Sequence, residues 1–232
     1  MSKKAKSSMQ NSKKFHFGIL DWFCVLFGLS MSIITPFIDH THSQIYIIVS
    51  IVMLICGLFE IILGIKGRRS NYIFAIINTF ASVYIAWIDQ FYGNMAINAF
   101  YIFVCLFGFY SWGKHRDRNK DVIARKLTIR QFLIAMAIFV VTSIGLNIVL
   151  VIFGGHATIL DSTSTILIIF ASILGALRYR EQWILWAITD ALTCIMWIET
   201  GNPAAIAMRA FYVVASIYGY FNWRKLIGDE KM

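Results

Sequence analysis

Two stretches decide the fold: NAFYIFVCLFGFYSWGK (98–114) and RAFYVVASIYGYFNWRK (209–225). Position 98 corresponds to position 209, and the constant spacing between matched positions is called the repeat offset below. Both stretches are rich in aromatic residues and end in Gly-x-x-x-Trp-x-Lys, and several other positions differ only in side-chain size. Such ordered agreement predicts an internal duplication. The identical pairs are Ala99/Ala210, Phe100/Phe211, Tyr101/Tyr212, Gly108/Gly219, Trp112/Trp223 and Lys114/Lys225.

The duplication extends upstream of these stretches. Trp-Ile-Asp at 87–89 resembles Trp-Ile-Glu at 197–199, and Gly-Asn follows within a few residues in both places. Agreement over two apolar stretches and the loop between them favours two copies of a three-helix unit over a chance match.

The composition requires a membrane. Of the 232 residues, 59% are hydrophobic and only 14% are charged, with a mean hydropathy of +0.69, whereas soluble domains carry about 25% charged residues. One soluble core of this length could not bury so much apolar surface, so the surplus is expected to face lipid. The net charge of +9 comes from short basic runs between apolar stretches, which argues against nucleic-acid binding.

Eight apolar stretches are long enough, or nearly so, to cross a bilayer as helices. None of them shows the alternation of a membrane β-strand, so α-helices are predicted. The first is longer than a signal-peptide core and lacks a cleavage site, so we expect it to be a retained span. The stretches are 18–38, 45–65, 72–88, 95–112, 132–153, 161–177, 183–198 and 204–223.

Lys and Arg residues predict the orientation. Twenty of the 21 lie in the N-terminal tail, in the loops after the second, fourth and sixth stretches, or after the eighth. The loops on the opposite side contain none, and the exception is Arg209, inside the last stretch. Because basic loops stay in the cytoplasm, both termini are predicted to be cytoplasmic.

The predicted fold is an all-α integral membrane protein with eight transmembrane helices. The two similar stretches run in the same direction, so the three-helix units are parallel, and one further helix must invert the chain between them. Parallel repeats with a substrate site at their interface recur among transporters. The expected parts are a basic tail (1–17), an extra N-terminal helix (18–38), a first repeat (45–113), a basic cytoplasmic loop (114–131), a linker helix (132–153) and a second repeat (161–225).

The stretch WILWAITDALTCIMWIE (183–199) carries the clearest candidate for a binding site. Trp183, Trp186, Asp190 and Thr193 recur at steps of three and four, so they share one helix face. A carboxylate in mid-span costs about 2.5–3.5 kcal/mol, so Asp190 is expected to face a partner or a wet cavity. Two interpretations stay open: a substrate-binding carboxylate beneath an aromatic wall, and a buried bond between helices.

Further polar and aromatic residues could line the same cavity. Glu60 is expected to reach Lys66 or the interface, with proton coupling as an alternative. Arg209 is expected to pair with one of three acidic residues, namely Asp190, Glu199 or Asp89. The further candidates for the substrate site are Asn78, Gln90, Asn94, Asn98, Tyr101 and Tyr212.

The shared Gly and Trp positions of the two stretches have structural interpretations. Gly108 and Gly219 are expected to allow close helix packing. Trp112 and Trp223 fall at the predicted cytoplasmic boundary, so anchoring at the membrane interface is their expected role.

Motifs typical of enzymes are missing or incomplete. The G-x-x-x-x-G-K at 108–114 is followed by His115 rather than Ser or Thr and ends an expected membrane helix, so it is no phosphate loop. The four cysteines lie in apolar stretches without C-x-x-C pairing, and the histidines lie in loops or the tail. No nucleophile elbow or H-E-x-x-H is present. The sequence therefore predicts no catalysis, no metal and no cofactor.

From about residue 45 to residue 225 the chain resembles the Pnu family of bacterial vitamin transporters, and most closely its PnuC-type members. The resemblance rests on W-x-x-W-x-x-x-D at 183–190, on the Gly-x-x-x-Trp-x-Lys endings and on the three-one-three organisation. It implies a fold related to that of the SWEET sugar transporters, with substrate held between the two bundles. It also implies homotrimers and facilitated diffusion of nicotinamide riboside across the bacterial inner membrane, with cytoplasmic phosphorylation trapping the substrate.

Thiamine stays open as an alternative substrate, because it is also a cationic aromatic that suits Trp stacking. Arg209 departs from the family, in which an uncharged residue is expected. Two rivals come from other classes. A membrane-embedded enzyme would need a cluster of acidic or His residues at the cytoplasmic interface, which the sequence lacks. A membrane scaffold predicts no polar cavity between the third, fourth, seventh and eighth spans.

Overall fold

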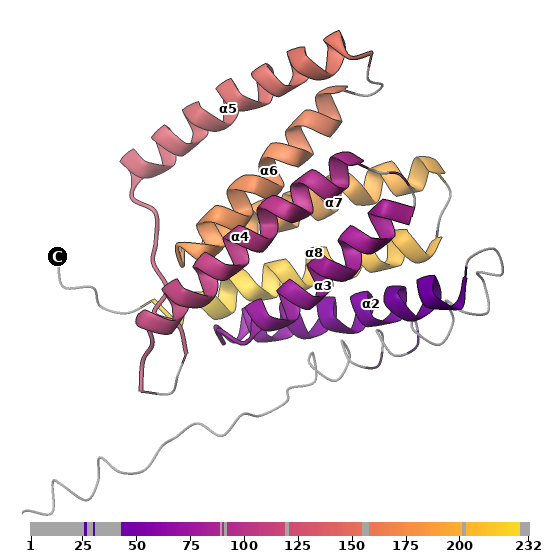
Figure 1. Cartoon of the computed structure of the whole chain (residues 1–232). Coiled ribbons are helices and arrows are strands. Elements are labelled where there is room, and N and C mark those ends of the chain that lie inside the picture. Colours follow the sequence, from indigo (N-terminus) through magenta and orange to yellow (C-terminus); the bar gives the residue numbers. More distant parts are fainter. Residues whose placement is uncertain are drawn as a thin grey trace, which may run out of the picture.

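The computed structural model describes Leu26, Ser30 and residues 43–88, 90, 92–118, 121–154, 158–200 and 203–227. The predicted basic tail (1–17) and, apart from Leu26 and Ser30, the extra N-terminal helix (18–38) lie outside the described residues. The described part of the chain from residue 43 onward is built from seven helices (Figure 1): α2 (Gln44–Ile65), α3 (Asn71–Ile88), α4 (Tyr92–Lys114), α5 (Ile129–Ile152), α6 (Thr158–Ala176), α7 (Gln182–Thr200) and α8 (Pro203–Trp223).

Each predicted apolar stretch from residue 45 onward coincides with one helix, and the bounds differ by at most three residues. Within the described ranges, four helical segments are long and apolar enough to cross a membrane: Gln44–Ile65, Asn71–Ile88, Met95–Lys114 and Ile129–Ile152. Ser162–Ala176 and Gln182–Ile195 are shorter apolar helical segments.

Local sequence signals account for several helix ends. The Ser43 hydroxyl accepts a hydrogen bond from the Tyr46 N–H (3.3 Å) at the start of α2. Thr128 and Gln131 form a reciprocal capping box at the start of α5. Pro203 begins α8, where its missing N–H leaves no hydrogen bond unmade. Side-chain and proline caps thus set where these three helices begin.

The helices pack as two groups in chain order. In one group α3 packs against α2 and α4, and in the other α7 packs against α6 and α8. The two groups meet where α4 contacts α6 and where α2 contacts α8. Helix α5 packs on α6 and leans away at the edge of the bundle (Figure 1), and none of its residues is buried. Its contact with α6 includes an edge-on meeting of Phe139 and Phe170, whose ring centroids lie 5.8 Å apart.

Two matching hydrogen bonds tie the groups together at one end of the bundle. Trp112 Nε1 donates to the Gly175 carbonyl (2.9 Å), and Trp223 Nε1 donates to the Gly64 carbonyl (3.0 Å). The two donors are separated by the repeat offset, and so are the two acceptors. The two indole rings also contact each other, with 5.3 Å between centroids.

The burial of these indoles corrects one prediction. Trp112 is 1% exposed and Trp223 is 0% exposed, so they are core residues rather than anchors at a membrane interface. The prediction failed because a Trp at the end of an apolar stretch looks the same in sequence whether it faces lipid or a neighbouring helix. The Gly108 and Gly219 prediction is confirmed. A Cβ on Gly219 would lie 2.6 Å from Trp183 Cδ2, and one on Gly108 would overlap the Tyr72 ring.

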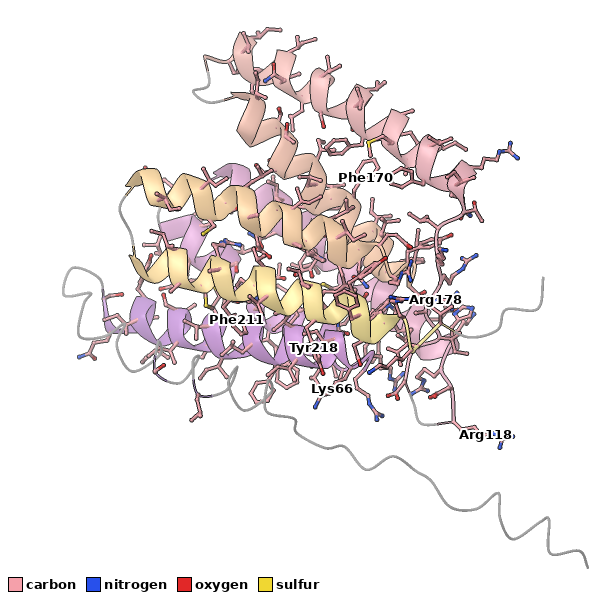
Figure 2. All side chains as sticks on the ribbon, turned by 180° about the vertical axis from the view of Figure 1, so that it is seen from behind. Lys66, Arg118, Phe170, Arg178, Phe211 and Tyr218 are labelled. Atoms are coloured by element: carbon pink, nitrogen blue, oxygen red, sulfur yellow. The ribbon has the colours of Figure 1, made fainter. Side chains whose placement is uncertain are left out.

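The predicted basic loop crosses this same end of the bundle and is held there by backbone hydrogen bonds. The Val122, Ala124 and Arg125 N–H groups donate to the carbonyls of Gly67, Leu226 and Arg178 at 2.8, 2.9 and 2.7 Å. Gly67 and Arg178 both adopt left-handed backbone conformations, with φ of 67° and 70°, and they too are related by the repeat offset. Figure 2 shows the labelled basic side chains Lys66, Arg118 and Arg178 gathered at this end. The segment thus joins the ends of both helix groups.

Candidate functional site

A cavity of about 940 Å³ lies among α2, α3, α4, α6, α7 and α8. Seven of the ten predicted site residues line it, and they come from both helix groups: Asn78, Asn98, Tyr101, Trp183, Trp186, Asp190 and Tyr212. The helix-face argument from the sequence therefore selected side chains that the fold brings together.

The other three predicted residues are placed differently. Thr193 is not among the described lining residues, and its hydroxyl donates to the Thr189 carbonyl (2.8 Å) within α7. Gln90 is exposed between α3 and α4, with a left-handed φ of 61°. Asn94 falls in the first turn of α4, and its side chain is outside the described residues.

Trp183 forms part of the cavity wall and is held on two sides. Its ring packs edge-on against Trp223, with 6.0 Å between centroids, and lies against the backbone of Gly219. The side chain is 6% exposed, yet its Nε1 finds no hydrogen-bond partner among the described residues. A buried indole N–H without an acceptor is costly, so this donor is available to a molecule in the cavity. Trp186, one turn further along α7, lines the same cavity.

Asp190 forms an ion pair inside the cavity wall. Arg209 Nη1 on α8 lies 2.9 Å from Asp190 Oδ1 on α7, so the predicted pairing of Arg209 is confirmed for one of the three acidic residues proposed. The Asp190 side chain is 8% exposed and that of Arg209 is 38% exposed. A paired carboxylate does not need a substrate cation to balance its charge. The structure therefore gives Asp190 a cation of the protein as its partner, which agrees with the expected bond between helices.

Glu60 corrects a second expectation. Instead of reaching Lys66 or the interface, it lines the cavity and accepts two hydrogen bonds. Asn78 Nδ2 donates to its Oε2 (3.1 Å), and the Tyr101 hydroxyl donates to its Oε1 (2.8 Å). The residues that hold Glu60 are 18 and 41 positions away along the chain. Its position near the end of an apolar stretch gave no sign of them.

Sequence reasoning also missed Asn71 and Gln182. Both line the cavity and are buried, at 8% and 6% exposure. Asn71 Oδ1 and Gln182 Nε2 have no hydrogen-bond partner among the described residues. Each amide begins a helix, which made it look like an ordinary polar residue at a span boundary. The two are related by the repeat offset, and that relation was the signal that could have found them.

Comparison with known proteins identifies the family to which this cavity belongs. The sequence pattern of a family described as "Nicotinamide mononucleotide transporter" matches residues 47–225. The chain belongs to this transporter family. The resemblance predicted from the sequence is thereby confirmed, and the family is one of transporters rather than enzymes.

This chain is also similar to transporters of nicotinamide riboside. The nicotinamide riboside transporter PnuC of Haemophilus influenzae is 37% identical over 180 residues, which cover 75% of this chain and 77% of the relative. The protein of the same name from Neisseria mucosa is 32% identical over 220 residues, covering 89% and 80%. A crystal structure of the vitamin B3 transporter PnuC matches with a TM-score of 0.72 and 28% identity, over 91% of this chain and 93% of that one.

The family match begins in the first turn of α2 and ends just after α8, so all the described residues that line the cavity lie within it. The membrane prediction is thus supported by the apolar helices and by the family together. The family description names a mononucleotide, whereas the named relatives are riboside transporters. These two molecules differ by a phosphate group, and the charges in the cavity bear on that difference.

Proposed function

We propose that this protein takes up nicotinamide riboside across the bacterial inner membrane by facilitated diffusion. The observation that carries the proposal is a cavity that combines the Trp183 and Trp186 rings with amides and a carboxylate, in a chain related to nicotinamide riboside transporters. A pyridinium ring suits indole faces through stacking and cation–π attraction. Its carboxamide and the ribose hydroxyls suit the polar groups around it.

The substrate is proposed to bind between the two three-helix groups. In this proposal Trp183 and Trp186 hold the ring, while the hydrogen-bonding contacts come from a larger polar set. All members of that set come from the sequence prediction. Thr193, Gln90 and Asn94 are kept in it although they are not among the described lining residues, and Gln90 and Asn94 would act at the outer mouth. The polar set is Asn78, Gln90, Asn94, Asn98, Tyr101, Asp190, Thr193 and Tyr212.

The proposed architecture has eight transmembrane helices as two parallel three-helix repeats (45–113 and 161–225), a linker helix (132–153) and an extra N-terminal helix (18–38). Its support is the matching of structural features at the repeat offset. The two Trp-to-Gly hydrogen bonds obey this spacing, as do the two left-handed residues Gly67 and Arg178. The place of α5 between the groups in the chain, and at the edge of the bundle in space, agrees with a linker role.

Two further parts of the proposal concern the membrane and the assembly. Both termini are proposed to be cytoplasmic, since the basic side chains gather at one end of the bundle (Figure 2). A homotrimer with a SWEET-related fold is proposed from the family resemblance. The apolar, uncovered α5 provides surface that either a second copy or lipid could cover.

Uptake by purified protein in liposomes tests the function. Labelled nicotinamide riboside should enter liposomes without an ion gradient and should exchange with unlabelled substrate on the other side. Thiamine and nicotinamide mononucleotide serve as competing substrates. Transport of none of the three would refute the transporter proposal, and dependence on an ion gradient would refute facilitated diffusion. Trp183→Ala, in protein that still elutes as a folded species, should abolish riboside binding.

A further inference from the structure

Glu60 stands on the face of α2 that looks into the cavity, between two glycines. Gly57 and Gly64 lie about one turn before and after it, and residues at these spacings share a helix face. A Cβ on Gly57 would lie 3.5 Å from the Tyr212 hydroxyl, and one on Gly64 would lie 3.6 Å from Trp183 Cη2. Because Gly57 and Gly64 have no side chains, Tyr212 approaches α2 on one side of Glu60 and Trp183 approaches it on the other.

The charges that line the cavity do not cancel. Among the described lining residues, the Lys, Arg, Asp and Glu side chains are Glu60, Asp190 and Arg209. Asp190 and Arg209 form the ion pair at 2.9 Å, which leaves Glu60 with the neutral donors Asn78 and Tyr101. Neutral hydrogen bonds compensate only part of the cost of burying a carboxylate. Among the described lining residues, an ionised Glu60 is therefore the one charge without an opposite charge beside it, and a bound cation would balance it.

We propose that Glu60 recognises the positive charge of the substrate and so makes the cavity selective for a monocationic nucleoside over its phosphorylated form. The proposal rests on the proposed transport function and deepens it. Nicotinamide riboside carries one positive charge, whereas the mononucleotide adds a phosphate that is close to a dianion at neutral pH. Glu60 repels this phosphate, and Arg209, the cation that could attract it, is already paired with Asp190.

The two hydrogen bonds on Glu60 fit this role. Asn78 from α3 and Tyr101 from α4 occupy one site on each carboxylate oxygen. A carboxylate can accept about four hydrogen bonds, so the remaining lone pairs stay available while the group itself is fixed. Such fixing keeps the negative charge at one place in the cavity and lowers the entropy lost on binding.

The test compares two ligands of nearly equal size, nicotinamide riboside and its neutral 1,4-dihydro form, whose ring has lost both the positive charge and its aromaticity. Wild-type protein in detergent should bind the cation at least about tenfold more tightly than the neutral form. Equal affinity would overturn the proposal, and this measurement needs no variant. Nicotinamide mononucleotide should bind on the order of 100-fold more weakly than the riboside, and equal affinity there would also overturn it.

Glu60→Gln separates the carboxylate from the Trp rings, which also favour a cation. Riboside affinity should fall roughly 10- to 100-fold, while affinity for the dihydro form should change less than about threefold. Equal losses for both ligands would mean that Glu60 only anchors hydrogen bonds, and no loss for either would remove it from the site. Asp117→Asn deletes a negative charge on the exposed basic loop and should leave both affinities unchanged.

A conservative variant provides the rescue. Glu60→Asp keeps the charge but shortens the side chain, so it should retain preference for the cation at reduced affinity. Loss of this preference would count against charge recognition. The proposed function and this inference fail separately. If the wild-type protein does not bind the riboside, the proposed function is refuted. If the wild-type protein binds the riboside and Glu60→Gln keeps the full preference for the cation, only the inference about Glu60 is refuted.

Discussion

The contact between Gly219 and Trp183 yields the sharpest prediction about packing, namely that Gly219→Ala destabilises the protein. The added Cβ would lie 2.6 Å from Trp183 Cδ2 and 2.7 Å from its Cε3. Carbon atoms in contact normally lie about 3.5–4.0 Å apart, so the indole or α8 must shift by roughly 1 Å. Overpacking of this kind typically costs about 1–3 kcal/mol.

Gly145→Ala is the matched control. Gly145 lies inside α5, and a Cβ there would meet nothing within 4 Å. Alanine stabilises a helix interior over glycine by roughly 0.5–1 kcal/mol. Both variants receive this helix gain, so the difference between them isolates the clash. Gly219→Ala should therefore be less stable than Gly145→Ala by about 1–3 kcal/mol.

Unfolding curves of the purified protein in detergent measure this difference, and ligand titration measures its consequence in the cavity. Because Trp183 lines the cavity, the shift that relieves the clash should also weaken nicotinamide riboside binding. Gly145→Ala should bind as the wild type does. If Gly219→Ala were as stable as Gly145→Ala and bound the riboside with unchanged affinity, the close packing of Trp183 on α8 would be refuted.

Three more variants test other contacts. Trp223→Phe removes the N–H that bonds the two helix groups and should lower the free energy of unfolding by about 1 kcal/mol; an unchanged unfolding curve would contradict this bond. Arg209→Gln leaves Asp190 without its cation, so it should lower the free energy of unfolding more than the double variant Arg209→Gln/Asp190→Asn does. If the effects of the two single substitutions on this free energy add up in the double variant, the two side chains are uncoupled. Trp186→Ala should weaken riboside binding at least about tenfold. Trp87→Ala, which removes a Trp that is 61% exposed on α3, should not, and equal losses from the two would remove Trp186 from the site.

The helices could be predicted from the sequence because hydropathy alone sets them. A membrane helix needs a long apolar run with polar ends, and such runs recover every helix from α2 to α8 to within three residues. The direction of side chains around each helix is harder to predict. Trp112 and Trp223 have the residue type and the position at the end of a span that are typical of membrane-interface residues, and only contacts with distant helices show that they are buried.

The candidate site was predictable where a motif lies on one helix. Trp183, Trp186 and Asp190 follow a helical period on α7, and the structure places all three around the cavity. Glu60 was not predictable in the same way, because its surroundings come from α3 and α4. Its neighbours in sequence are apolar residues and Lys66, which suggest a carboxylate that reaches the membrane surface. A single sequence cannot show that such a residue turns inward.

Positions related by the repeat offset fall into two kinds: those that pack the helix groups together and those that line the cavity. At the basic end the paired positions make the same contacts: Trp112 and Trp223 each bond a glycine carbonyl in the other group, and Gly108 and Gly219 each admit a ring. Inside the cavity some paired positions stay alike, such as Tyr101 and Tyr212, but each charged lining residue is paired with an uncharged residue. The pairs matched by the repeat offset are Glu60 with Ala171, Thr79 with Asp190, and Asn98 with Arg209.

This division has a physical reason. Equivalent contacts at the end of the bundle hold two similar helix groups together, and such contacts require that the residues on both sides stay alike. The substrate carries one positive charge. Two unpaired carboxylates in the cavity would leave one buried negative charge without a partner. In this chain one carboxylate is balanced by Arg209 and the other, Glu60, is not. Among the described lining residues this leaves one carboxylate, Glu60, without a cation beside it, and a monocationic substrate would supply that cation.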